Sequence, residues 1–471
     1  MLMLIMRHEL LLVLITVILL LVEIFLPADR KQKIILPALI LFGVVMILGF
    51  IPGPTGRLFG GMYITTPLTL LMKNILTVGV FIVFLQSVDW LKKEENREKI
   101  SEYFILLLST LIGMEYMLSS GDFLMFYLGL ELATIPLAAL AAFERFKEKS
   151  AEAGVKLIFT SALSSGILLY GLSMIYGTVG TLYFSDVVNG INGAPLQILA
   201  FIFFFAGMAF KISVVPFHLW TADVYEGAPI NITSYLSVIS KGAAVMILTI
   251  LLFTVFSKVA IMWKDVVYVT AILTMTIGNL FAMRQKNLKR FLAFSSIAQA
   301  GFIFLGIIGQ SQLGMTTVIY FVLVYIFSNL GAFGVVAVIS NRTGKEKIDD
   351  YDGLYRTNPM LSLTMMLALF SLAGIPPVAG FFGKFFLFAA AAQQGLYILV
   401  LIAVLNTIIS LYYYLLVVKA MFLNRSDRPI EYFKSDGYSR LGLAICIAGL
   451  VIIGIYSPIY EFINQFTFGI Y

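Results

Sequence analysis

Four ionisable side chains stand inside long apolar stretches of the sequence: Glu131, Lys211, Lys241 and Lys384. A charge at the middle of a bilayer costs about 3 kcal/mol even on lenient insertion scales, so each such group needs a partner, water or a function. A desolvated lysine gives up its proton readily, and a neighbouring carboxylate opposes that release. Side chains of these two kinds at similar depth therefore predict a proton relay along the middle of a membrane.

The depth of each residue can be read from the helical rise. Glu131 lies ten residues into a stretch that starts near Gly121, roughly 15 Å deep. Lys241 lies about thirteen residues into its own stretch, and Lys211 and Lys384 lie well inside theirs. The alternative is a set of static buried ion pairs, or lysines that extend to the interface. Ionisable residues inside a membrane favour a functional role.

Two further residues are candidates for supporting roles. His218 follows Pro216 by two positions, and its imidazole could shuttle protons at a helix break that admits water. Lys156 sits near the start of its apolar stretch, where it either joins the relay or extends to the interface. A second group lies closer to the ends of apolar stretches and is interpreted as structural: Lys73, Glu115 and Lys419.

The elements that must position these groups are transmembrane helices. Hydrophobic residues make up 60% of the 471 residues and charged ones only 12%, whereas soluble domains carry about a quarter charged residues. We expect an all-α integral membrane protein of about fourteen transmembrane helices. The predicted spans are 9–26, 34–51, 67–90, 102–120, 121–142, 153–177, 195–219, 228–254, 262–283, 289–309, 313–340, 360–390, 396–422 and 440–465.

The loops predict the orientation. Basic residues gather after the odd-numbered spans, which places those loops in the cytoplasm and both termini outside. The loop predicted after the seventh span does not fit, because it carries Asp223 and Glu226 and no basic residue. The basic residues that support the rule are Arg30, Lys31, Lys33, Lys92, Lys93, Arg97, Lys99, Arg145, Lys147, Lys149, Arg284, Lys286, Lys289, Arg290, Arg342, Lys345, Lys347, Arg425 and Arg428.

Composition also argues against several classes of function. One cysteine and two histidines cannot build a thiolate cluster or a histidine-rich metal site. The net charge of +6 comes from short loops between spans, so it does not indicate nucleic-acid binding. No loop is long enough to fold as a nucleotide-binding domain. The stretch 9–26 lacks a small-residue cleavage site and is interpreted as the first span.

The seventh and twelfth spans share a pattern that suggests internal symmetry. Each places a lysine near a proline: Lys211 precedes Pro216, and Lys384 follows Pro376 and Pro377. Five spans separate the two, so the helices run in opposite directions through the membrane. An inverted repeat of five helices with broken helices at matching positions has this arrangement.

Several motifs resemble one family. The most specific reads FKISVVPFHLWTADVYEGAP at 210–229 and leads on to Ser240 and Lys241. Three more agree with it: LGLE at 128–131, NLKRFLAFSSIA at 287–298 and LAGIPPVAGFFGK at 372–384. Together they resemble the N subunits of respiratory complex I, the proton-pumping NADH:quinone oxidoreductase, and the similarity in pattern extends over nearly the whole chain.

The resemblance implies an antiporter-like fold with two inverted five-helix repeats and broken helices 7 and 12. It implies an N-terminal three-helix segment (1–101), a first repeat (102–254), a second repeat (255–422) and a C-terminal helix (423–471). By this similarity the functional residues are the charged pair Glu131 and Lys211, the central Lys241, the exit-side Lys384, the seventh-helix His218 and the sixth-helix Lys156.

One position departs from the family pattern. Gln299 stands where many relatives have a histidine after the Ser-Ser-Ile-Ala sequence. An amide cannot titrate, although it can hold water by hydrogen bonds. Gln299 is therefore expected to orient water at most.

The resemblance also implies a function and its setting. The chain would be a membrane-arm subunit in the inner cell membrane that translocates protons while quinone is reduced elsewhere in the complex. It would bind no cofactor itself; NADH or another donor, FMN, iron–sulfur clusters and quinone would be used by other subunits. Its partners would be other membrane-arm subunits and the lipid bilayer, with no nucleic acid. Two alternatives remain: a subunit of a multisubunit cation/proton antiporter, which the VPFHLW sequence disfavours, and a structural membrane subunit that conducts nothing.

Overall fold

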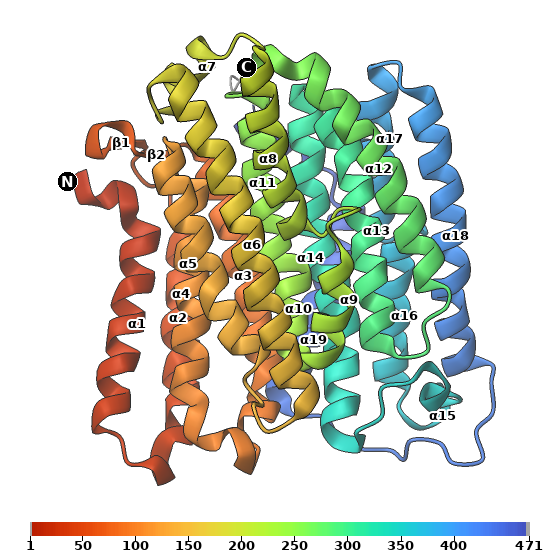
Figure 1. Cartoon of the computed structure of the whole chain (residues 1–471). Helices are drawn as coiled ribbons and strands as arrows, with labels where there is room; N and C mark the ends of the chain where they lie inside the picture. The colour runs from red at the N-terminus through yellow and green to blue at the C-terminus, as the bar shows by residue number, and fades with distance from the viewer. Residues whose placement is uncertain (1, 468–471) are drawn as a thin grey trace.

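Long apolar helices run up and down between two faces of the molecule, as the predicted alternation of spans and short loops requires (Figure 1). The computed structural model describes residues 2–467. Their α-helices are α1 (Arg7–Phe25), α2 (Ile35–Gly49), α3 (Pro67–Leu91), α4 (Ile100–Leu118), α5 (Phe123–Ala141), α6 (Glu148–Val179), α7 (Phe184–Gly190), α8 (Pro195–Ile212), α9 (Leu219–Gly227), α10 (Ile230–Tyr235), α11 (Lys241–Phe253), α12 (Ala260–Ala282), α13 (Leu288–Ile308), α14 (Gln312–Thr343), α15 (Leu354–Thr357), α16 (Pro359–Ala373), α17 (Ala379–Gln393), α18 (Tyr397–Phe422), α19 (Gly437–Ile455) and α20 (Pro458–Phe466).

Short elements join the long helices. One antiparallel hairpin pairs β1 (Gly56–Leu58) with β2 (Tyr63–Thr65), with Arg57 opposite Ile64. A π-helical turn, Leu236–Ser240, connects α10 to α11. Short 3₁₀ segments cover Leu2–Met6, Ala28–Ile34, Phe59–Gly61, Glu94–Lys99, Ser257–Val259 and Ile348–Tyr351.

The predicted number of membrane crossings is confirmed. Thirteen helical stretches in the described residues are long and apolar enough to span a membrane, and the shorter α16 and α17 together make one more crossing. Every residue in the apolar window of α13 is buried inside the protein, and 94% of that of α14 is. The outer helices α1 and α18 instead expose apolar side chains such as Phe25 and Tyr397, the surface that a lipid bilayer would cover.

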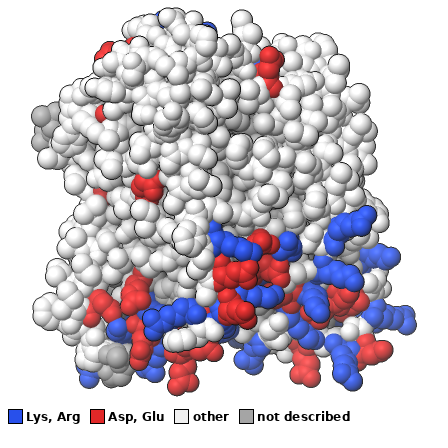
Figure 2. Space-filling view, in the orientation of Figure 1, with Lys and Arg blue, Asp and Glu red and all other residues white. Residues whose placement is uncertain are grey.

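Charged residues separate to one face. Figure 2 shows lysine, arginine, aspartate and glutamate gathered at the end of the bundle where α3, α5, α12 and α14 finish. We refer to this end as the charge-rich face and to the opposite end as the charge-poor face. The start of α1 lies toward the charge-poor face (Figure 1), and α20 contacts the start of α14 at the same face. This asymmetry agrees with the loop pattern that the sequence predicts.

The prediction of a loop after the seventh span is wrong. The segment forms the helix α9, which continues the seventh span beyond a break. Its two acidic residues meet basic residues of other helices. Asp223 lies 2.8 Å from both Lys156 of α6 and Arg290 of α13. Glu226 lies 3.0 Å from Arg290 and 3.1 Å from Lys149. Basic residues of α6 and α13 therefore supply the positive charge that this segment lacks. A count of the basic residues within the segment cannot detect them.

Both predicted helix breaks are confirmed. α8 ends at Ile212, Ser213 takes a left-handed conformation (φ 66°), and α9 starts six residues later. α16 ends at Ala373, followed by Gly374 at φ 86°, before α17 begins at Ala379. Unwound backbone inside a membrane is tolerated where it is enclosed by protein or lines a hydrated path. The breaks therefore leave backbone oxygens available to other groups.

Candidate functional site

Glu131 and Lys211 face one another across α5 and α8. Glu131 lies near the middle of α5 and Lys211 in the last turn of α8. The two half-buried groups interact electrostatically, but the Lys211 ammonium donates its hydrogen bond to the hydroxyl of Thr134, one turn beyond Glu131. Oxygen Oε1 of Glu131 is buried without a hydrogen-bond partner. The pair is therefore close enough to influence each other's charge while no salt bridge locks it.

Lys241 is held by a single residue of α13. Its Nζ atom donates to the carbonyl oxygen of Ser296 at 3.1 Å and to the Ser296 hydroxyl at 3.0 Å. The lysine is only 2% exposed. The π-helical turn at Leu236–Ser240 ends directly before it. Such turns widen the helix, interrupt its regular hydrogen bonds and often occur at functional sites.

Lys384 occupies the break between α16 and α17. Its Nζ donates to the carbonyl oxygen of Ala373 at 3.2 Å and stands 4.5 Å from the centre of the Phe302 ring. The side chain is 3% exposed. Ala373 is the last residue of α16, so its carbonyl is one that the helix end leaves free. The carbonyl group at the end of α16, the first half of the broken helix, thus binds the lysine on α17, the second half.

Gln299 lies between the partners of these two lysines. Its Nε2 donates to the carbonyl oxygen of Leu372 at 3.1 Å and to the hydroxyl of Tyr414 at 3.2 Å. It is one turn of α13 after Ser296, and Leu372 directly precedes the Ala373 that binds Lys384. Oε1 of Gln299 is buried and accepts no hydrogen bond. Polar groups of α13 and of the α16 end therefore lie in the space between Lys241 and Lys384.

The hydroxyl-bearing members of this arrangement were not predicted from the sequence: Thr134, Ser296 and Tyr414. Serine, threonine and tyrosine are common in transmembrane helices, so their presence alone carries little information. A spacing argument could have found two of them. Thr134 follows Glu131 by three residues and Ser296 precedes Gln299 by three, which places each on the same helix face as its charged or amide neighbour.

His218 and Lys156 have different surroundings. His218 is buried at the start of α9 (8% exposed), and its Nδ1 atom has no hydrogen-bond partner. Lys156 lies 2.6 Å from Glu152 and 2.8 Å from Asp223, and its side chain is 39% exposed. Lys156 therefore belongs to the ion network of the charge-rich face, whereas His218 lies buried in the seventh-helix break beside the backbone of Pro216.

A charged cavity opens on the charge-rich face beside the start of α13. Its volume is about 450 Å³, and its lining includes Glu144, Glu226 and Lys289. Lys289 is buried and donates to the carbonyl oxygen of Ala228 at 2.9 Å. Along α13 it precedes Ser296 by seven residues, about 10 Å of helix. The cavity thus brings solvent within two helical turns of the Lys241 ligand.

One step of the predicted relay has no direct connection. In the part of the chain that the structure describes, no hydrogen bond links Lys211 to Lys241 or to His218. α8 and α11, which carry the two lysines, nevertheless pack against each other. A proton that crosses between them would need water or a side-chain movement.

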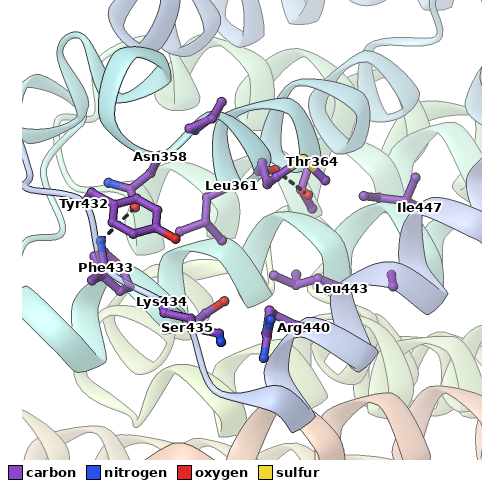
Figure 3. A pocket seen from close by; sticks show the side chains of 13 residues that line it. Asn358, Leu361, Thr364, Tyr432, Phe433, Lys434, Ser435, Arg440, Leu443 and Ile447 are labelled. Carbon is purple, nitrogen blue, oxygen red and sulfur yellow. Dashed lines mark hydrogen bonds between the residues drawn. The ribbon is translucent and has the colours of Figure 1, made fainter.

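A second cavity, of about 610 Å³, is separate from the lysines. It lies between α16, α19 and the segment 432–435, and Figure 3 shows Arg440 and Leu443 facing Tyr432 and Leu361 across it. Asn358 forms part of its wall and donates to the carbonyl oxygen of Glu431 at 3.1 Å. None of the four predicted relay residues lines it. It is therefore not part of this site.

Comparisons with known proteins agree with this geometry. Residues 120–410 match the family described as NADH:quinone oxidoreductase/Mrp antiporter, TM. NADH-quinone oxidoreductase subunit N of Phocaeicola vulgatus is 51% identical over 461 residues, which cover 98% of both chains. The protein of the same name from Desulforamulus reducens is 40% identical over 434 residues, which cover 90% of both.

Solved structures show the same fold. A chain of respiratory complex I from Thermus thermophilus with bound aureothin has a TM-score of 0.78 and 26% identity, with 96% of this chain and 97% of that chain covered. A chain of the Mrp complex from Dietzia sp. has a TM-score of 0.87 at 20% identity, with 99% and 98% covered, a likeness of fold alone. On the matched region and the identity over nearly its full length, the chain belongs to the NADH:quinone oxidoreductase/Mrp antiporter family, within its group of N subunits.

Proposed function

We propose that this chain is a membrane-arm subunit of a proton-translocating NADH:quinone oxidoreductase and that it moves protons through the buried lysine row. The observation that carries the proposal is the row of polar groups between the two lysines: Lys241 binds Ser296, Gln299 one turn further along α13 binds Leu372, and the adjacent Ala373 binds Lys384. The high identity to proteins named NADH-quinone oxidoreductase subunit N supports the assembly.

The chemistry of the path follows from its ligands. Lys241 and Lys384 are held by neutral oxygens, and among residues 2–467 neither has a carboxylate partner that would fix its charge. A change in charge at Lys211, driven by Glu131, would alter the field at Lys241 in a medium of low dielectric constant. Protons would enter from the charged cavity near Lys289 and pass along the hydroxyl and amide groups of α13.

The setting of the pump is part of the proposal. The charge-rich face would lie in the cytoplasm, and both termini outside. Oxidation of NADH or another donor, and reduction of quinone, would occur at cofactors in other subunits. Their effect would reach this chain through the neighbour that contacts α5, by changing the position or protonation of Glu131.

A multisubunit cation/proton antiporter is the second candidate, because the likeness of fold to a chain of the Mrp complex has a TM-score of 0.87. Mass spectrometry of the purified assembly separates the two. Subunits with cluster-binding and quinone-site sequences would indicate the oxidoreductase, whereas only further antiporter-like subunits would indicate the rival.

The pump itself is tested in sealed membrane vesicles. We expect Glu131→Gln and Lys211→Met each to lower proton uptake coupled to quinone reduction while the assembled complex remains. Lys419→Met is the matched control, because Lys419 is an exposed lysine near the end of α18. Normal pumping by both assembled variants would remove the relay from consideration.

A further inference from the structure

A second group of buried charges lies outside the lysine row, between α1, α3 and α4. Glu9 of α1 and Lys73 of α3 form an ion pair of 2.5 Å, and both side chains are fully buried. The hydroxyl of Tyr63, on β2, donates to Glu9 at 2.9 Å and accepts from Lys73 at 3.1 Å. From its place near a span end, Lys73 is expected to be structural. Its complete burial shows that it does not reach the interface.

A third charged residue makes this group unbalanced. Glu115 of α4 is fully buried and interacts electrostatically with both Glu9 and Lys73. Neither of its carboxyl oxygens has a hydrogen bond of good geometry, and oxygen Oε2 of Glu9 also lacks one. The Thr77 hydroxyl, which contacts Glu115, donates its proton to the carbonyl oxygen of Lys73. Two carboxyl groups therefore share one ammonium group.

The remaining titratable neighbours do not supply a second positive charge. His8 pairs with Asn74 at 3.0 Å, so its Nε2 atom binds an amide rather than either carboxyl group. Arg7 is turned to the carbonyl oxygen of Ile51 at 2.6 Å. The phenols Tyr63, Tyr116 and Tyr235 also lie within the electrostatic reach of the group. An excess carboxylate in this environment would be an unpaired buried charge, which proteins avoid by protonation.

A cavity on the charge-poor face ends close to this group. It has a volume of about 360 Å³, and its lining includes Arg57, Thr69, Leu118 and Ser120. Thr69 precedes Lys73 by four residues on α3, and Leu118 follows Glu115 by three on α4. Each is therefore about one helical turn from the buried charges. Water in this cavity would need to cross only that turn to reach the carboxyl groups.

We propose that Glu9, Glu115 and Lys73 form a second proton-binding site, in which one exchangeable proton resides on the Glu115 carboxyl and exchanges with the charge-poor face. Binding converts one carboxylate and a proton from water into a carboxylic acid, and the site as a whole becomes neutral. Use of this site for proton release during turnover rests on the proposed function. Occupancy of the site by a proton does not.

Infrared spectroscopy of the purified complex tests the proposal without measuring turnover. A buried protonated carboxyl gives a C=O stretching band that shifts when the sample is transferred to D₂O. We expect Glu115→Gln to lose one such band. Glu102→Gln is the matched control, because Glu102 is an exposed glutamate at the other end of α4, and this variant should keep the band.

Two further variants give different expected results. Glu9→Gln leaves Glu115 as the single carboxylate beside Lys73, so the acid band should also disappear. Lys73→Gln removes the ammonium group, and a second acid band should appear because both carboxyl groups must then be neutral. An unchanged spectrum in assembled Glu115→Gln or Glu9→Gln would overturn the proposal and leave a static ion cluster. Failed pumping by the Glu131 variants, or its persistence, would not alter this result.

Discussion

The lysines of the central row are satisfied by neutral oxygens, which is the residue-level feature that suits them to proton transfer. Lys211 uses a threonine hydroxyl, Lys241 a serine hydroxyl and carbonyl, and Lys384 the free carbonyl of Ala373. Such partners stabilise the ammonium form less than a carboxylate does and still accept a hydrogen bond when the proton is present. The Glu9–Lys73 pair differs from these three lysines, because there a buried lysine contacts a carboxylate directly.

The serine beside Lys241 is the sharpest test at this scale. Ser296→Ala removes the hydroxyl and leaves the carbonyl oxygen, a loss of about 1 kcal/mol that corresponds to about a fivefold change in proton-transfer rate. We expect coupled proton uptake to fall accordingly, and Ser296→Thr, which keeps a hydroxyl, to retain most of it. Vesicle pumping assays measure both. Equal rates for the alanine variant and the unmodified chain would exclude the hydroxyl from the path.

Gln299 offers a second residue-level test. Gln299→Leu has a similar volume but lacks the amide that bonds Leu372 and Tyr414, so we expect slower pumping. Gln299→His restores a titratable side chain and should keep or raise the rate. Vesicle pumping would be compared with the amount of assembled complex in each sample. If the Gln299→Leu variant and the unmodified chain pump protons at equal rates, the amide has no part in proton transfer.

At the scale of elements, three interruptions of helical structure place backbone or side-chain ligands in the membrane. Two are the breaks at 213–218 and 374–378, and the third is the π-helical turn before Lys241. The second break is held by close packing. Gly380 of α17 donates its backbone N–H to the Ser371 hydroxyl at 3.1 Å, and that hydroxyl also contacts Ser328 of α14 at 2.7 Å.

This packing predicts a position where the smallest side chain is required. A methyl group on Gly380 would overlap the Ser371 carbonyl group, so Gly380→Ala should destabilise the subunit by about 1–3 kcal/mol. Gly437→Ala is the control, because a methyl group there meets open space. Thermal unfolding of the purified complex, followed by loss of this subunit, measures the effect. Equal midpoints for the two variants would show that the break can accommodate the methyl group.

At the scale of the whole molecule, the charges divide the bundle into two unequal faces (Figure 2). The charge-rich face carries the ion network between α6, α9 and α13 and the cavity that reaches Lys289. The charge-poor face carries the cavity of about 360 Å³, one turn from Lys73 and Glu115. A proton that crosses from one face to the other would therefore meet a cavity lined by charged side chains at one end. At the other end it would meet a cavity that lies one helical turn from buried charges.

The orientation of these faces can be tested with cysteine labelling. The single native cysteine, Cys446, is fully buried, so it should not react. Phe146→Cys lies on the charge-rich face and Ser185→Cys on the charge-poor face, and both positions are exposed. We expect a membrane-impermeant maleimide to label the first only in inside-out vesicles and the second only in right-side-out vesicles. The reverse pattern would place the charge-rich face outside.

Much of the element-level description could be predicted because its causes are local. Apolar stretches long enough to cross a bilayer define the spans, and proline and glycine define the breaks near Lys211 and Lys384. The extension of the seventh span through α9 was missed, because Asp223 and Glu226 resemble loop residues until their partners on other helices are known. The roles of the individual site residues and the boundaries of the two five-helix repeats stay predictions.

The sequence by itself determined that charged groups lie inside membrane helices, since composition and spacing fix the depth of Glu131, Lys241 and Lys384 along each helix. It could not determine which groups meet, because helix rotation and packing decide which faces touch. Only the tertiary structure joined Lys241 to Ser296 and left Lys211 on Thr134. The same packing buried Glu9, Lys73 and Glu115 together, although they lie far apart in the chain and near the ends of their helices.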